Sequence, residues 1–113
     1  MSDGCLVLIS SLSTDQIQVV NSRRMLDSLT GMKIQFETLD GSVPENKERR
    51  DECFAISGQR GKYPQCFLTG EGPMRFIGVW EDVESLMECD SIPEEVLAAN
   101  PEIKTFAKVG IYA

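Results

Sequence analysis

The residues best suited to covalent chemistry in this 113-residue chain are its four cysteines, at positions 5, 53, 66 and 89. No two of them stand within three residues of each other, so the chain has no C-x-x-C pair, and it contains no histidine. Structural zinc sites usually place cysteines as close pairs, so we expect no metal site. In a reducing cytosol, scattered cysteines are mostly small buried apolar residues, and we expect that role here.

A second set of residues stands where two short apolar runs begin and end, in the stretch GKYPQCFLTGEGPMRFIGVWEDVESL. Pro64 opens the first run and Gly78 ends the second, and Trp80 and Asp82 follow directly. Proline has no N–H to donate to a strand pairing, so it belongs at the beginning of a strand. Glycine permits a tight turn. This pattern predicts that the two strand ends lie beside each other.

Composition excludes several kinds of partner. The chain carries 18 acidic and 11 basic residues, a formal net charge of -7, which repels phosphate backbones and anionic lipid surfaces. No apolar run approaches the roughly 20 residues that cross a bilayer, and the start MSDGCLVLIS has an acid where a signal peptide has basic residues. We therefore expect a cytoplasmic protein that binds neither nucleic acid nor membrane, with one domain over residues 1–113.

The first third of the chain predicts a strand–helix–strand unit. The aliphatic run Cys5–Ser10 is typical of a central strand that is buried on both faces. Ser13 and Gln16 have the spacing of a capping box at the start of a helix, and Gly31 is suited to end it. The alternating stretch KIQFETLD predicts a second strand. A crossover of about twenty residues favours a parallel pair.

The middle of the chain predicts a helix followed by a hairpin. In SVPENKERRDECFAISG, Ser42 and Glu45 have the spacing of a second capping box, and Gly58 can supply the left-handed residue at the end. The two runs Gln65–Thr69 and Met74–Gly78 are joined by a glycine-rich turn. That arrangement predicts an antiparallel pair.

The remaining residues predict a third helix over Asp82–Cys89 and a short fourth helix in SIPEEVLAAN, capped by Ser91 with Glu94. The expected order is βαβαββα, with a core over about residues 5–89 and an extension over residues 90–113. An α/β fold with a four-stranded mixed sheet, flanked by helices on both faces, accommodates every apolar run.

This order, with a proline opening the third strand, resembles the thioredoxin fold and more closely its glutaredoxin branch, over roughly residues 5 to 89. KYP, residues 62–64, matches the cis-proline of that fold, and IGVWED, residues 77–82, matches the glycine turn and acid that hold glutathione. The resemblance implies a cis Tyr63–Pro64 bond, which would leave the N–H and C=O of Tyr63 free to pair with an extended peptide. Gly78 would turn the chain beside it.

The chain departs from the glutaredoxin pattern at the nucleophile. Glutaredoxins carry a cysteine just after the first strand, where the start of the next helix lowers the thiol pKa. Here the corresponding loop is SSLSTDQ, residues 10–16, without cysteine. A serine hydroxyl is too weak an acid to replace a thiol, and no histidine is present as a base. Cys5 stands at the other end of its strand, about 16 Å away. We therefore expect no enzymatic activity.

A serine-rich, cysteine-free first loop resembles one group in particular, the SH3-domain-binding glutamic-acid-rich-like proteins. LVLISSLSTDQIQ and NKERRDECF stand where that family has its first strand, loop and helix and its charged second helix. The resemblance implies a redox-inactive adaptor. We expect protein partners, with a homodimer as one arrangement that stays open, and no cofactor. The chain has no P-x-x-P motif, so we do not expect binding to SH3 domains through a polyproline helix. The expected binding groove consists of Ser11, Ser13, Thr14, Tyr63, Pro64, Gly78, Val79, Trp80 and Asp82.

Two other interpretations remain open at this stage. A glutathione-binding protein or weak glutaredoxin-type oxidoreductase is favoured by the helix start at Ser13 and Thr14, which can receive a carboxylate, and by Asp82. A structural subunit of an assembly is favoured if Trp80 is an exposed interface anchor, whereas its ring could instead fold over the third helix. The prolines and glycines would then serve to shape the fold.

Overall fold

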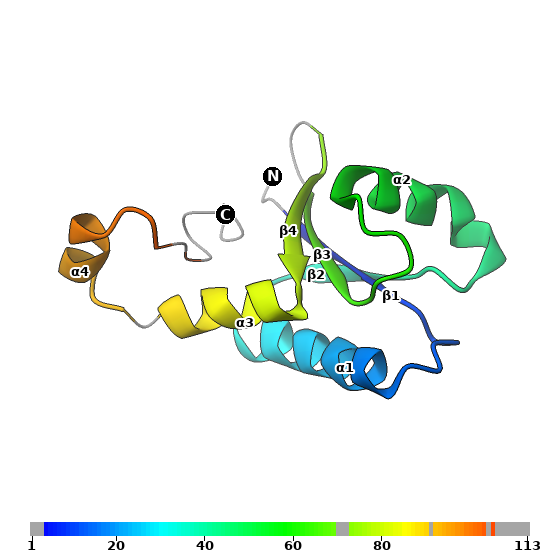
Figure 1. Cartoon of the computed structure of the whole chain (residues 1–113), viewed down its shortest axis with the longest axis horizontal. Helices are drawn as coiled ribbons and strands as arrows, with labels where there is room; N and C mark the ends of the chain where they lie inside the picture. The colour runs from blue at the N-terminus through cyan, green and yellow to red at the C-terminus, as the bar shows by residue number, and fades with distance from the viewer. Residues whose placement is uncertain (1–3, 70–72, 91, 104, 106–113) are drawn as a thin grey trace.

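Figure 1 presents the computed structural model of the chain, which describes residues 4–69, 73–90, 92–103 and 105. Within them a four-stranded sheet has the order β2-β1-β3-β4. The strands are β1 (Gly4–Ile9), β2 (Phe36–Asp40), β3 (Gln65–Thr69) and β4 (Arg75–Val79). β1 pairs parallel with β2 and antiparallel with β3, and β3 pairs antiparallel with β4. The predicted α/β fold with a mixed sheet and the order βαβαββα is confirmed.

The central strand β1 is buried on both faces, as its aliphatic composition predicts. Its residues from Cys5 to Leu8 are each at most 2% exposed. Because side chains alternate along a strand, Cys5 and Val7 contribute to one hydrophobic cluster and Leu6 and Leu8 to another. The sheet therefore separates two cores, one under each helical layer.

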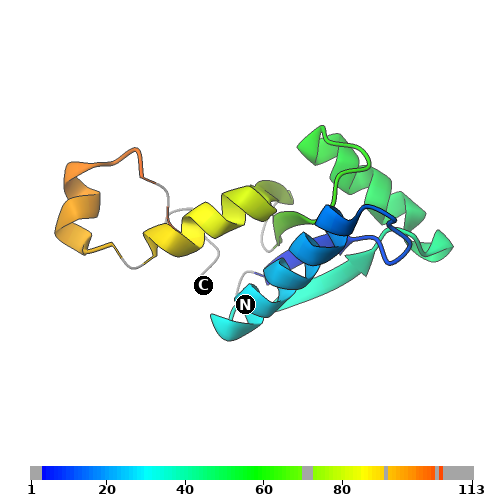
Figure 2. The same cartoon turned by 60° about the horizontal axis from the view of Figure 1, so that its bottom comes forward.

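The first layer consists of α1 (Gln16–Gly31) and α3 (Trp80–Cys89), which contact each other on one face of the sheet (Figure 2). Met25 and Leu29 of α1 are fully buried there, in one cluster with Val83 of α3. Each buried side chain of this size stabilises the fold by about 1.5–3 kcal/mol relative to exposure.

The second layer, on the opposite face, is α2 (Lys47–Ser57), preceded by the 3-10 turn η1 (Pro44–Asn46) (Figure 1). Cys53 and Phe54 of α2 pack with Phe67 of β3, whose ring centroid lies 5.3 Å from that of Phe76. The charged side of α2 remains toward solvent. Helices on both faces were predicted, and this is confirmed.

The ends of α1 differ from the prediction. Its N-cap is Asp15, whose carboxylate accepts hydrogen bonds from the first turn, and Ser13 lies outside the helix. Gly31 is the last helical residue, and the left-handed residue is Lys33, with φ 59°. Asp15 rather than Ser13 is the N-cap because the negative charge of its carboxylate also interacts favourably with the positive end of the helix dipole.

The ends of α2 were predicted in part. Gly58 adopts the expected left-handed conformation, with φ 71°, and its N–H bonds to the Phe54 carbonyl. Ser42 does not cap α2, because its hydroxyl is bonded to Asp40 and Ser11 instead. The helix begins after η1, at Lys47.

The C-terminal part holds α4 (Glu94–Ala99), which lies apart from the sheet in both views. Its N-cap position is Pro93, while Ser91, the predicted cap, and residues 106–113 of the tail lie outside the described residues. α3 begins at Trp80, two residues before the predicted start. Among the described residues, no helix has the length and apolar character needed to cross a membrane.

Candidate functional site

The residues predicted as a binding groove gather at one end of the sheet. At that end Ile9 pairs with Asp40, and Gln65 pairs with both Leu8 and Val79. The loops that follow β1, β2 and β4 therefore meet the loop that precedes β3. We call this region the loop edge; it comprises residues 10–17, 40–43, 61–64 and 78–82.

Tyr63 and Pro64 form the centre of the loop edge. The peptide bond between them is cis, as the resemblance implied. Pro64 is buried, whereas the half-buried Tyr63 ring meets the edge of Phe54, with 6.0 Å between ring centroids. Burial raises the pKa of the Tyr63 phenol, so it stays protonated at neutral pH. Within the described residues, the main-chain N–H and C=O of Tyr63 make no hydrogen bond.

Gln65 holds the segment that leads into Pro64, a role that sequence reasoning missed. Its side chain is fully buried, and Nε2 donates to the carbonyl oxygens of Gln59 at 2.6 Å and Lys62 at 2.7 Å. Its Oε1 has no hydrogen-bond partner among the described residues. A glutamine at the start of an otherwise apolar strand is the sequence signal that could have indicated this role.

Gln18 joins the first loop to the segment before Pro64. The Ser13 hydroxyl donates to Gln18 Oε1 at 3.0 Å, and Gln18 Nε2 donates to the Gly61 carbonyl at 3.4 Å. Ser13 and Tyr63 were predicted to line one site, and this bridge places their two loops side by side.

Asp40 fixes the loop after β1 to the loop after β2. Its Oδ1 accepts from the Ser11 N–H at 3.1 Å, the Ser42 N–H at 3.0 Å and the Ser42 hydroxyl at 2.6 Å. Partial burial opposes ionisation, but the hydrogen bonds from Ser11 and Ser42 outweigh it and lower the Asp40 pKa from 3.8 to about 2. The Ser11 hydroxyl, 2.9 Å from that of Ser42, is thereby part of a structural network.

The start of α1 is occupied by the chain's own carboxylate. Asp15 Oδ1 accepts from the N–H of Ile17 at 2.9 Å and of Gln18 at 3.3 Å. These are the donors that would stabilise a thiolate or a ligand carboxylate at a free helix start. The prediction that the helix start at Ser13 and Thr14 receives a carboxylate is therefore corrected: Asp15 already supplies one.

Gly78 and Asp82 shape the turn between β4 and α3. Asp82 Oδ2 accepts from the Val79 N–H at 3.0 Å, which caps the first turn of α3. A Cβ atom at Gly78 would lie 2.6 Å from Asp82 Oδ2 and would also collide with the Asp82 Cβ. The turn therefore requires glycine at this position. In this structure the Asp82 carboxylate is therefore bonded to a main-chain N–H at the start of its own helix.

Trp80 is a core residue. It is 7% exposed and belongs to the cluster that contains Val83 and Leu86 of α3. The interpretation of Trp80 as an exposed anchor is wrong, and the alternative, a ring folded against the third helix, agrees with the structure. Exposed apolar side chains are found instead at Leu12, 75% exposed, and Ile17, 71% exposed. Sequence reasoning missed the exposure of both side chains.

Cys53 and Cys66 are buried in the two cores of the sheet. Burial and the neighbouring Glu52 raise the pKa of Cys53 to about 11. A hydrogen bond with Cys5 and burial raise the pKa of Cys66 well above its ordinary value. No group of three or more metal-ligating side chains occurs among the described residues.

No protein-family model matches the chain, and a search of curated proteins finds no match either. The strand order β2-β1-β3-β4 with the element order βαβαββα is consistent with a thioredoxin-like fold. The arrangement can bind through main-chain groups and exposed apolar side chains, and none of the four cysteines falls within the loop edge.

Proposed function

We propose that this chain is a non-catalytic protein-interaction module, whose loop edge binds an extended segment of a protein partner. The observation that carries the proposal is the exposure of Leu12 and Ile17, at 75% and 71%. They stand on the loop and the first helical turn where redox-active thioredoxin-like proteins place their thiol. Exposed apolar area of this kind favours contact with another apolar surface.

The main chain beside these side chains supplies the second element of the proposed interaction. Tyr63 has an N–H and a C=O without partners among the described residues, and it lies at the loop edge beside the buried Pro64. An extended peptide gains affinity by pairing with such groups, and it gains specificity from alternate side chains. We propose that the partner's alternate side chains are apolar and contact Leu12 and Ile17.

Three features argue against exchange chemistry at this edge. The first loop carries hydroxyls, which are too weakly acidic to form a nucleophile without a base. The Asp15 carboxylate occupies the helix start and would repel a second anion. The thiols of Cys53 and Cys66 are buried and have raised pKa values. We therefore propose a protein that is not an enzyme.

The closer family assignment is also a proposal. The serine-rich first loop and the charged α2 resemble the SH3-domain-binding glutamic-acid-rich-like proteins, a redox-inactive group that acts through protein partners in the cytoplasm. The lack of a P-x-x-P motif leads us to propose a partner that is recognised by strand-like pairing rather than by an SH3 domain. A second copy of the chain is one such partner.

The test is affinity capture from a cell lysate, followed by binding measurements with each purified partner. The double variant Leu12→Ser/Ile17→Ser should weaken binding by at least about tenfold, which corresponds to about 1.4 kcal/mol. The matched control is Ile56→Ser/Val96→Ser, which changes apolar residues that are 38% and 42% exposed elsewhere. Equal binding by the two double variants would refute the proposed surface.

Glutathione binding is the competing function, and a calorimetric titration separates the two. We expect no heat of binding, because Asp15 fills the helix start that would hold a glutathione carboxylate. Saturable binding that is strengthened by Asp15→Asn would favour the glutathione hypothesis instead.

A further inference from the structure

Two buried cysteines from neighbouring strands bring their sulfur atoms into contact inside the sheet's first core. Cys5 on β1 and Cys66 on β3 are 61 residues apart in sequence, and their Sγ atoms are 3.2 Å apart. In the antiparallel register Cys5 pairs with Leu68 and Cys66 with Val7. The two cysteines are therefore diagonal neighbours on the face that α1 and α3 cover.

The sulfur atoms must move closer to become bonded. A disulfide has an S–S distance of about 2.05 Å, so they would have to approach by about 1.1 Å. Diagonal neighbours in an antiparallel pair lie about 7–8 Å apart, beyond the usual span of a disulfide, so the two strands must shift slightly as well. The two side chains already face each other across the central strand pair. No change of strand register is required.

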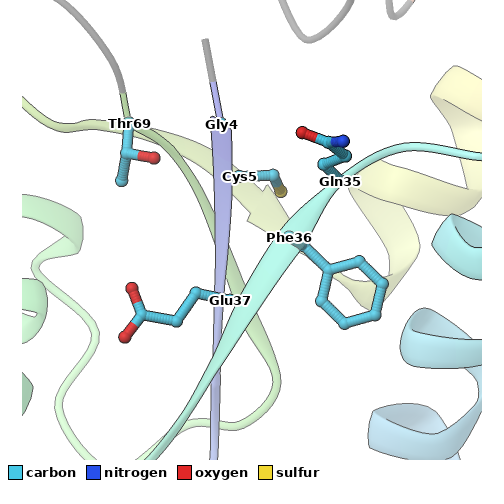
Figure 3. A pocket seen from close by; sticks show the side chains of 6 residues that line it. All are labelled: Gly4, Cys5, Gln35, Phe36, Glu37 and Thr69. Atoms are coloured by element: carbon cyan, nitrogen blue, oxygen red, sulfur yellow. The ribbon is translucent and has the colours of Figure 1, made fainter. Parts of the chain in front are cut away.

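A cavity lies at the end of the strands where Cys5 stands. It has a volume of about 210 Å³ and is lined by Gly4, Cys5, Gln35, Phe36, Glu37 and Thr69. Figure 3 shows the Cys5 side chain on the side of the strands that Gln35 and Phe36 occupy. The cavity is several times the roughly 30 Å³ that one water occupies in the liquid. Hydrogen peroxide therefore fits beside Cys5, which lines the cavity, whereas Cys66 does not line it. Because Cys5 is 2% exposed, its thiol is reached through a local opening of the strand end.

We propose that Cys5 and Cys66 form a peroxide-sensitive dithiol whose oxidation closes a disulfide between β1 and β3. The Cys5 sulfur attacks one oxygen of hydrogen peroxide: an S–O bond forms, the O–O bond breaks, and the departing hydroxide leaves as water with the proton that the Cys5 thiol gives up. The Cys66 sulfur then attacks the Cys5 sulfur: the S–S bond forms, the S–O bond breaks, and hydroxide leaves with the Cys66 proton as water. Two thiols and one peroxide give one disulfide and two waters, with two electrons passing from sulfur to oxygen.

The two thiols have different roles in this sequence. Cys66 is fully buried, and its hydrogen bond with Cys5 raises its pKa, so it retains its proton while Cys5 reacts. The cavity opens at the end of the sheet opposite the loop edge, because it includes Gly4 and Thr69, which pair with each other. The site is therefore independent of the proposed partner-binding surface, and each proposal can fail without the other.

The test is peptide mapping of the purified full chain after treatment with hydrogen peroxide. Free thiols are blocked with N-ethylmaleimide, and the protein is digested without reduction. We expect the peptide that contains Cys5 to be linked to the peptide that contains Cys66, with release by dithiothreitol. Because contact between the sulfurs requires the fold, the link should form at least about tenfold faster in native protein than in concentrated urea.

Two variants sharpen the test. Cys53→Ala/Cys89→Ala should form the same link at the wild-type rate. Cys66→Ala should form no internal disulfide and should leave a Cys5 sulfenic acid that dimedone traps. If a variant does not fold, the peptide mapping of the wild-type protein by itself decides whether the Cys5–Cys66 link forms. The proposal is overturned if native oxidation joins other cysteines, if the Cys5–Cys66 link forms no faster than in urea, or if Cys5 is oxidised while Cys66 remains a free thiol.

Discussion

The turn between β4 and α3 makes a specific prediction about Gly78. A methyl group at this position would stand 2.6 Å from Asp82 Oδ2 and 2.7 Å from Asp82 Cγ, closer than non-bonded atoms approach. Gly78→Ala must therefore displace Asp82 and break its hydrogen bond to the Val79 N–H. Loss of a helix-capping bond costs about 1 kcal/mol, and overpacking costs about 1–3 kcal/mol. We expect the free energy of unfolding to fall by about 2–4 kcal/mol.

The assay is urea denaturation followed by the fluorescence of Trp80, the chain's single tryptophan, which lies two residues from the substitution and is buried in the folded state. Part of this cost arises from the Asp82 side chain, so the same substitution should cost about 1–2 kcal/mol less in an Asp82→Gly background. The remaining cost reflects the φ of 158° at Gly78, which residues other than glycine rarely adopt. Gly31→Ala is the matched control, because a Cβ there meets nothing within 4 Å. It should stabilise the helix slightly. An equal cost of Gly78→Ala in both backgrounds would refute the account.

Three further changes test the surroundings of the loop edge. Asp40→Asn should lower stability near neutral pH by about 1 kcal/mol, discounted for solvent screening. Because the folded Asp40 pKa of about 2 lies below its ordinary 3.8, the wild-type advantage is present above pH 3.8 and should vanish as pH falls toward 2 in acid titrations followed by circular dichroism. Asp15→Ala should destabilise by about 1 kcal/mol in urea, through loss of the α1 cap, and unchanged stability would argue against that cap. Trp80→Ala should cost about 3–5 kcal/mol, whereas Leu12→Ala should change the thermal midpoint little; similar effects would contradict the difference in burial.

The regular elements could be predicted because their signals are local. Gln65–Thr69 was predicted with the bounds that the structure has, since Pro64 and the glycine-rich turn limit it at both ends. The parallel pairing of β1 and β2 followed from the length of the crossover. The cis bond before Pro64 was implied by the family resemblance alone, because nothing in the composition of the segment distinguishes cis from trans.

The details of the loop edge could not be predicted, because they depend on contacts between distant residues. Asp40 and Ser11 are 29 residues apart, and no local pattern connects them. Asp15 and Gln18 have the same capping-box spacing as Ser13 and Gln16, so the sequence is compatible with two N-cap positions for α1. The charged carboxylate of Asp15 is the stronger hydrogen-bond acceptor, and the helix begins after it. Trp80 follows a strand directly, and whether such a ring points into the core depends on where the next helix packs.

The account's central claim is that the loop edge binds without exchanging thiols. The most direct measurement is the glutathione-dependent reduction of a glutathionylated peptide by the purified protein, with the reaction in buffer alone as the reference. Such a peptide is too large for the cavity beside Cys5, and the loop edge carries no thiol. We predict a rate equal to that in buffer. A faster rate that is abolished by replacing one of the four cysteines with alanine would contradict the claim.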